Sequence, residues 1–247
     1  MSSEFTPGDH VRWFAKRRGW QLAKKNILVE GENDQKYFEL AARLYEEKYH
    51  RQLIGTQLAI FPTGSGDKGG AYGIQKYFRT FRHLIEEDLS PEGMKLFHAI
   101  ALLDNDPKGK QTYRALTARH TEFHENRDLF LLYRKFPRNT REPNTLTQLI
   151  EKENQLWKRL DCEIEDLLSV DLLKLFVNGN SDYIQSEPID LNGAHHFKFK
   201  THAKALLFRF VEENASLEEV IMVVEVLKSL RFYLGLEPDG ELIKNIF

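Results

Sequence analysis

The stretch Asn26-Ile-Leu-Val-Glu-Gly-Glu-Asn-Asp34 decides the fold, because a short apolar run ends there abruptly at a glutamate and a glycine. Residues 26–29 have the length and composition of a buried strand, and residues 34–49 then repeat apolar side chains at helical spacing. A strand followed directly by a helix is the repeating unit of parallel sheets. The stretch therefore predicts the start of an α/β fold.

The same pattern recurs further along the chain. Apolar runs at 58–61, 96–103 and 129–133 each predict another strand, and helical periodicity returns after the first two. Strands that are apolar throughout are typical of a parallel sheet covered by helices on both faces. We therefore expect an α/β fold with a four-stranded parallel sheet, within a domain at residues 26–140.

Two further regions flank this domain. Residues 1–25 carry six basic and two acidic side chains among apolar ones, which predicts a basic amphipathic segment. After about residue 141 the strand signal disappears, and residues 141–247 are expected to form a mainly helical addition that completes the site. Its expected elements are helices within 145–175, 200–214 and 216–234 and a polar loop at 178–197.

Composition limits the class of protein. The 247 residues suffice for one large domain, and a net charge of −2 excludes a generally basic protein that coats nucleic acid, although not a nuclease with a local basic surface. Cys162 is the only cysteine, so neither an intrachain disulfide nor a cysteine-based zinc site can form. The N-terminal residues contain no apolar signal core, and no run approaches about 18 apolar residues. We therefore expect a cytoplasmic protein with no membrane contact.

Acidic residues lie where the expected strands end. Glu30 follows the first strand, and Asp104 and Asp106 follow the third, two positions apart on a segment where such side chains point to the same side. Ligands of open parallel sheets bind at the carboxyl ends of the strands. Three converging carboxylates repel one another unless a hard cation neutralises them, and all-oxygen ligands suit Mg²⁺ or Mn²⁺. We therefore expect a metal site, although each acid taken alone is also explained as a solvated loop residue.

These residues resemble the Toprim domain, which occurs in topoisomerases, bacterial primases and overcoming-lysogenization-defect (OLD) nucleases. The resemblance covers residues 24–140 and rests on Val29-Glu-Gly-Glu-Asn-Asp34, a glycine-rich turn and Leu103-Asp-Asn-Asp-Pro107, in that order. It implies that Glu30 is an acid, a base or a metal ligand and that both aspartates of the later element bind the metal. Asp34 resembles the OLD-type branch, where the acid at this position assists a second metal.

The C-terminal region adds two expectations from the same resemblance. The segment Glu163-Ile-Glu-Asp-Leu-Leu168 resembles an acidic and hydrophobic element of that branch, and its Glu165 is expected to complete a two-metal site. The alternative is an amphipathic helix whose acidic face is solvated. Lys198, Lys200 and Lys204 lie where the branch places a catalytic lysine, which would stabilise charge developing on the phosphate. Among these three lysines we favour Lys200.

Four basic residues are candidates for contacts with nucleic-acid phosphates. Arg17 and Arg18 belong to the basic N-terminal segment, for which the solvated face of a packed helix is the alternative. Lys68 lies in the glycine-rich turn at 64–70, which lacks the Gly-Lys-Ser/Thr ending of a nucleotide-binding P-loop and is alternatively only a tight turn. Lys108 follows the aspartate pair directly.

The function that the resemblance implies is hydrolysis of phosphodiester bonds by a Toprim-type, metal-dependent endonuclease. No tyrosine occupies a position that marks a topoisomerase nucleophile, and no template-handling module of a primase is visible. OLD-type nucleases commonly work with an ATPase, and this chain has no ATPase motif, so a separate ATPase partner in a bacterial anti-phage system is implied. The alternative is a non-catalytic Toprim module that binds nucleic acid or nucleotide. The residues do not distinguish DNA from a structured RNA such as tRNA.

One apolar stripe indicates an interaction surface. In the last expected helix the apolar side chains recur at helical spacing and form a stripe that is wide for a surface helix. We therefore expect it to be covered by a second copy of the chain, giving a homodimer, or by a partner. The stripe consists of Leu217, Val220, Val223, Val224, Leu227 and Leu230.

Overall fold

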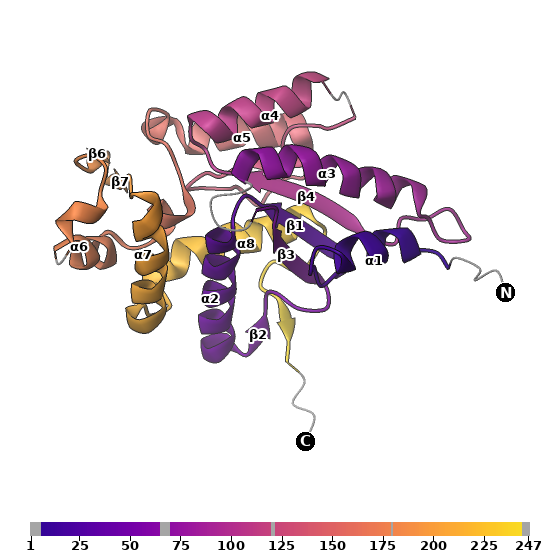
Figure 1. The fold of residues 1–247 in the computed structure, drawn as a ribbon, viewed down its shortest axis with the longest axis horizontal. Coiled ribbons are helices and arrows are strands. Elements are labelled where there is room, and N and C mark those ends of the chain that lie inside the picture. The colour runs from indigo at the N-terminus through magenta and orange to yellow at the C-terminus, as the bar shows by residue number, and fades with distance from the viewer. Residues whose placement is uncertain (1–5, 65–69, 120–121, 179, 244–247) are drawn as a thin grey trace.

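The computed structural model describes residues 6–64, 70–119, 122–178 and 180–243. Its centre is a four-stranded sheet in the order β3-β1-β4-β5, and every neighbouring pair is parallel (Figure 1). The α/β fold with a four-stranded parallel sheet flanked by helices is therefore confirmed. The strands are β1 (Lys25–Val29), β3 (Leu58–Pro62), β4 (His98–Leu103) and β5 (Leu129–Leu131).

Both faces of the sheet are buried, which explains why its strands are apolar throughout. Ile27 and Val29 of β1 join one hydrophobic core, and Leu28 between them joins the other. Helices α1 (Asp9–Lys16), α3 (Gly70–Glu87) and α4 (Pro107–Arg119) contribute to the core with Leu28. Helix α2 (Glu32–Tyr49) and the C-terminal helices cover the opposite face.

The C-terminal region is mainly helical, as expected, but its first part is interrupted. The region 145–175, which was predicted to be helical, forms two α-helices separated by short 3₁₀ turns, because the polar segment between them folds back towards the sheet. None of the helices within the described ranges has the length and apolar composition needed to cross a membrane. The elements are α5 (Pro143–Glu153), η1 (Gln155–Trp157), η2 (Ile164–Leu167), α6 (Val170–Asn178), η3 (Ser181–Tyr183), α7 (Thr201–Asn214), η4 (Glu218–Val220) and α8 (Ile221–Tyr233).

The expectation that no strand follows residue 141 is wrong. β6 (Ile189–Leu191) and β7 (Ala194–His196) form an antiparallel hairpin inside the predicted polar loop. Its two turn residues, Asn192 and Gly193, have φ of 52° and 76°, as a tight hairpin turn requires. A second small sheet pairs β2 (Arg51–Gln52) with β8 (Glu241–Leu242). The Asn-Gly pair was a signal for the hairpin that the periodicity argument overlooked.

The apolar stripe of the last helix faces inward. Its six side chains are between 0% and 6% exposed and belong to the core between the sheet and the C-terminal helices. Helix α8 packs against α2, so this chain itself covers the stripe. The prediction that a second copy or a partner covers the stripe is therefore wrong. The stripe no longer supports the expectation of a homodimer.

Candidate metal centre

The ends of the two central strands bring the first predicted acids together. β1 and β4 are parallel neighbours, so Glu30 and Asp104 leave the sheet side by side. The Glu30 Oε1 accepts a hydrogen bond of 3.2 Å from the backbone N–H of Asp104. Asp34, in the first turn of α2, accepts one of 2.8 Å from the N–H of Gly31. Local strand-to-helix geometry therefore holds three carboxylates at one edge of the sheet.

The motif after β4 builds a tight connection into α4. Asp106 Oδ1 accepts a hydrogen bond of 2.6 Å from the N–H of Gly109, which satisfies a free donor of the first helical turn, and Pro107 begins that helix. A Cβ at Gly109 would lie 2.0 Å from the carbonyl oxygen of Asp104, so only glycine permits this approach. The carboxylate of Asp106 is close enough to raise the pKa of Glu30, but one of its oxygens is engaged in capping.

A segment far along the chain completes the acidic group. Asn105 and Cys162 exchange backbone hydrogen bonds of 2.9 and 3.3 Å, which attaches the segment before η2 to the loop between the two aspartates. Glu163 follows directly, and Glu165, two residues further along, is 2% exposed. Asp166 then fixes η2, because its Oδ2 lies 2.8 Å from Nδ1 of His196. The C-terminal region thus brings Glu165 close enough for the charge of Asp34 to add to the effect of burial on its pKa. Its part in a two-metal site stays a prediction.

The lysine at this centre is Lys204. Its Nζ lies 2.5 Å from Glu163 Oε2 and 3.3 Å from Glu165 Oε1, on the first turn of α7. Lys200, which the sequence analysis favoured, is the residue that precedes this helix, and no contact with an acidic residue is found for it among the described residues. The placement of Lys200 in the site is corrected to Lys204, because one helical turn carries the later side chain round to the acids.

The carboxylates are held in a poorly hydrated environment. Burial raises the pKa of Glu30 to about 7, with a further contribution from Asp34. Burial likewise raises the pKa of Glu165 to about 7 against the opposing effect of Lys204. Burial also raises the pKa of Asp34, and that of Asp104 well above its usual range, the latter with help from Asp34 and Glu30.

Several apolar side chains cause this burial. Asp34 and Asp104 line a cavity of about 10 Å³, and the other residues that line it are apolar. Burial alone would lower the pKa of Lys204, yet Glu165, Glu163 and Asp104 together raise it, so the ammonium stays charged. Lys204 therefore contacts two of these carboxylates, Glu163 and Glu165, and no salt bridge to Lys204 is found for Glu30, Asp34 or Asp104 among the described residues. Full ionisation of the group in the absence of a cation is unfavourable, because the pKa values of Glu30 and Asp104 are raised.

Two buried oxygen atoms support a cation at this centre. The Tyr37 hydroxyl forms no hydrogen bond among the described residues, and Glu165 Oε1 has only the ion pair of 3.3 Å with Lys204. Burial raises the pKa of Tyr37, and the charge of Glu165 adds to this effect. Buried polar atoms without partners are rare and often mark an ion or a bound water. Mg²⁺ or Mn²⁺ would fit the all-oxygen donors. Within the described ranges no group of three Asp, Glu, His or Cys side chains is spaced to hold a metal ion. Asp34 and Glu30 instead accept hydrogen bonds from backbone N–H groups, and Glu163 is paired with Lys204.

The predicted phosphate contacts lie at different distances from this centre. Lys108 is close to Glu30, since a Cβ at Gly70 would lie 3.2 Å from Lys108 Nζ and 3.6 Å from Glu30 Oε2. Lys68 lies outside the described residues. The Arg17 guanidinium lies 5.2 Å from the ring centre of Trp13, and no contact with the acids of the centre is found for it among the described residues.

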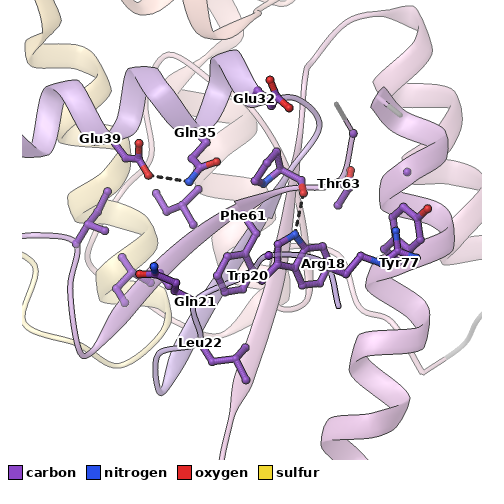
Figure 2. A pocket seen from close by; sticks show the side chains of 18 of the residues that line it. Arg18, Trp20, Gln21, Leu22, Glu32, Gln35, Glu39, Phe61, Thr63 and Tyr77 are labelled. Atoms are coloured by element: carbon purple, nitrogen blue, oxygen red, sulfur yellow. Dashed lines mark hydrogen bonds between the residues drawn. The ribbon is translucent and has the colours of Figure 1, made fainter. Parts of the chain in front are cut away.

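Arg18 lines a cavity of about 1080 Å³ along the free edge of β3. Its guanidinium lies 3.6 Å from the ring centre of Tyr77, and Figure 2 shows the two side chains together. Trp20, also in Figure 2, stacks on Phe61 and donates a hydrogen bond of 3.2 Å to the carbonyl of Pro62. Thr63 lines the same cavity, which therefore extends from the basic N-terminal segment to the end of β3.

Comparisons with protein-family models, with curated proteins and with solved structures find no match for this chain. Three residues of the centre were not chosen from the sequence: Tyr37, Glu163 and Lys204. Tyr37 looks like an ordinary core residue of an amphipathic helix, and nothing local indicates that its hydroxyl faces acids. Glu163 and Lys204 were visible as members of an acidic and a basic cluster, but only the tertiary contacts select them.

Proposed function

We propose that this chain is a metal-dependent nuclease of the Toprim type that hydrolyses phosphodiester bonds. The observation that carries the proposal is the convergence of Glu30, Asp34, Asp104 and Glu165 at the carboxyl ends of two parallel strands, with Lys204 among them. A binding module for a polyanion gains nothing from buried acids that repel phosphate. A metal-dependent hydrolase requires them.

Asp104 and Glu30 would hold one metal, and Asp34 and Glu165 would hold or assist a second. When bound, Mg²⁺ or Mn²⁺ supplies Lewis-acid stabilisation of the phosphate and a more acidic water. Lys204 keeps its proton and stabilises negative charge that develops on the phosphate oxygens. Lys108, exposed beside Glu30, is placed to contact a neighbouring phosphate.

The substrate class in this proposal is nucleic acid, either DNA or a structured RNA such as tRNA. A separate ATPase is the proposed regulatory partner, in a bacterial anti-phage system, because a metal-dependent nuclease that cleaves freely would damage its own cell. These biological roles rest on the Toprim resemblance of residues 24–140.

The test is cleavage of supercoiled plasmid, single-stranded DNA and total tRNA by the purified chain, alone and with the proposed ATPase, with and without Mg²⁺ or Mn²⁺. We expect metal-dependent products that EDTA prevents and that Asp104→Asn loses at least about 100-fold. Asp171→Asn, on the exposed face of α6, is the matched control and should cleave normally. Full cleavage in EDTA or by Asp104→Asn contradicts the proposal. Metal-independent binding without any cleavage, alone or with its ATPase, identifies the binding module instead.

A further inference from the structure

A second cavity, of about 540 Å³, adjoins the acidic centre across the Asn105–Cys162 bridge. Both bridging residues line this cavity, whereas their chain neighbours Asp104 and Glu163 belong to the acidic group. Successive side chains of an extended segment point to opposite sides, which explains the arrangement. The same pair of backbone segments therefore forms a wall between the acids and the cavity.

Two helices supply one polar stripe each to the cavity. Lys110, Tyr113 and Arg114 of α4 line it, at the spacing of one helical face. Gln148 and Lys152 do the same from α5. Figure 1 shows the two helices next to each other, and the cavity lies between their facing stripes.

Cationic side chains outnumber acidic ones in the wall of this cavity, in a chain of net charge −2. Five cations line it against two glutamates, and the cations are Lys110, Arg114, Arg134, Lys152 and Lys158. Lys110 is paired with Asp161 at 3.0 Å and Arg134 lies 3.9 Å from Asp166, so the other three carry the excess charge. Arg114, Lys152 and Lys158 are exposed and form no ion pair with any residue that the structure describes. The larger cavity of Figure 2 is different, because its two cations are balanced by two glutamates. The excess of free cations predicts an anionic ligand.

Aromatic side chains lie among these cations. Tyr133 and Trp157 are half-buried in the cavity wall, and Tyr113 is 7% exposed. Neither tyrosine hydroxyl has a hydrogen-bond partner in the described ranges. Flat rings beside cations suit a ligand that combines a planar base with a phosphate, since bases stack on aromatic side chains and phosphates pair with Lys and Arg. A volume of about 540 Å³ is in the range of small-molecule sites.

We propose that this cavity binds one nucleotide unit, with its base against the aromatic wall of Tyr133 and Trp157 and its phosphate at Arg114 and Lys158. As a substrate subsite, it would hold the nucleotide next to the bond that the acidic centre attacks, and this part rests on the proposed function. The charges of the two sites agree with this arrangement. The cations of the cavity attract a phosphate directly, whereas the acids of the centre attract one only through a bound cation.

The test measures binding in EDTA, where the proposed cleavage cannot occur, so it can fail independently of the nuclease proposal. Isothermal titration of the full chain uses adenosine 5′-monophosphate, inorganic phosphate and a short single-stranded oligonucleotide as probes. We expect the mononucleotide to bind at least about tenfold tighter than phosphate, because base stacking adds to the anion contact. We expect the oligonucleotide to bind tighter still.

Variants then locate the binding. Arg114→Ala and Lys158→Ala should each weaken oligonucleotide binding about three- to tenfold and reduce its log–log salt slope by about 0.7. Lys174→Ala, on the exposed face of α6, is the matched control and should change neither. Trp157→Leu should weaken mononucleotide binding about fivefold or more, and Trp157→Phe should retain most of it.

Three results overturn the proposal. Mononucleotide binding no tighter than phosphate means that the aromatic wall contributes nothing. An equal effect of Lys174→Ala means that the chain binds polyanions without a defined site. Equal affinity for mononucleotide and oligonucleotide leaves a free-nucleotide site and overturns the substrate-subsite part.

Discussion

Replacing Glu30 by glutamine should stabilise the metal-free chain at alkaline pH. Burial holds the pKa of Glu30 at about 7, above its ordinary 4.5. The folded chain therefore binds more protons than the unfolded chain between these values, and its stability falls as pH rises through about 7. Since each pKa unit is worth about 1.4 kcal/mol, ionised Glu30 costs the folded chain up to about 3 kcal/mol at pH 8.

Glutamine removes this cost and keeps an acceptor oxygen for the backbone N–H of Asp104. We expect Glu30→Gln to be about 1–3 kcal/mol more stable than wild type at pH 8 in EDTA, which raises the melting temperature by about 3–9 °C. At pH 4.5 the two chains should melt within about 1 °C, because Glu30 is then largely protonated when folded.

Differential scanning calorimetry in EDTA at both pH values measures the effect. Glu187→Gln removes an exposed carboxylate in a loop and serves as the matched control, with no expected change at either pH. Adding Mg²⁺ or Mn²⁺ should stabilise the wild type more than Glu30→Gln, since only the wild type regains the cation that its charge requires. If Glu30→Gln melts at or below the wild type at pH 8 in EDTA, the argument from buried repulsion is wrong.

Three further changes test how the centre is built. Gly109→Ala places a Cβ 2.0 Å from the carbonyl oxygen of Asp104 and should lower the free energy of unfolding by about 2–3 kcal/mol in chemical denaturation. The control is Gly31→Ala, whose Cβ meets nothing nearer than 3.7 Å and which should cost less than about 1 kcal/mol. Equal losses of stability in the two variants contradict the steric argument. Lys204→Met removes the ammonium that contacts Glu163 and Glu165 and should lower the free energy of unfolding by about 2–3 kcal/mol at pH 8 in EDTA. An unchanged stability would contradict the assignment of Lys204 to the centre. The hydrogen bond with Asp166 raises the pKa of His196. The stability that protonated His196 contributes is therefore complete below pH 6.5 and is lost as pH rises through the raised pKa. His196→Gln should reduce this pH dependence of the melting temperature, and an unchanged pH profile refutes the assignment to His196.

The parts of the fold that the sequence predicts are those in which local pattern and tertiary environment agree. The sheet could be predicted because strands such as residues 58–61 are buried on both faces and are therefore apolar throughout. Glu30 and Asp104 could be predicted as a pair because parallel neighbouring strands end at the same edge. These inferences need only composition and the geometry of a parallel sheet.

The remaining parts of the site depend on contacts between distant segments. Glu163 reaches the acids only through the Asn105–Cys162 bridge, which joins positions 57 residues apart, and no spacing rule predicts that pairing. The choice between Lys200 and Lys204 depends on where α7 begins, which sequence patterns locate only to within a few residues. The stripe of α8 looked exposed because the periodicity of one helix does not show which element covers it.

Locating Mn²⁺ by anomalous X-ray diffraction tests the proposed metal centre most directly. Crystals of the chain would be grown with MnCl₂, and data would be collected at the manganese absorption edge. We expect an anomalous peak within about 2.5 Å of carboxylate oxygens of Glu30 and Asp104, and its loss in Asp104→Asn. A map with no peak at the carboxyl ends of β1 and β4, or with a peak that remains in Asp104→Asn, would contradict the assignment of these acids to a metal.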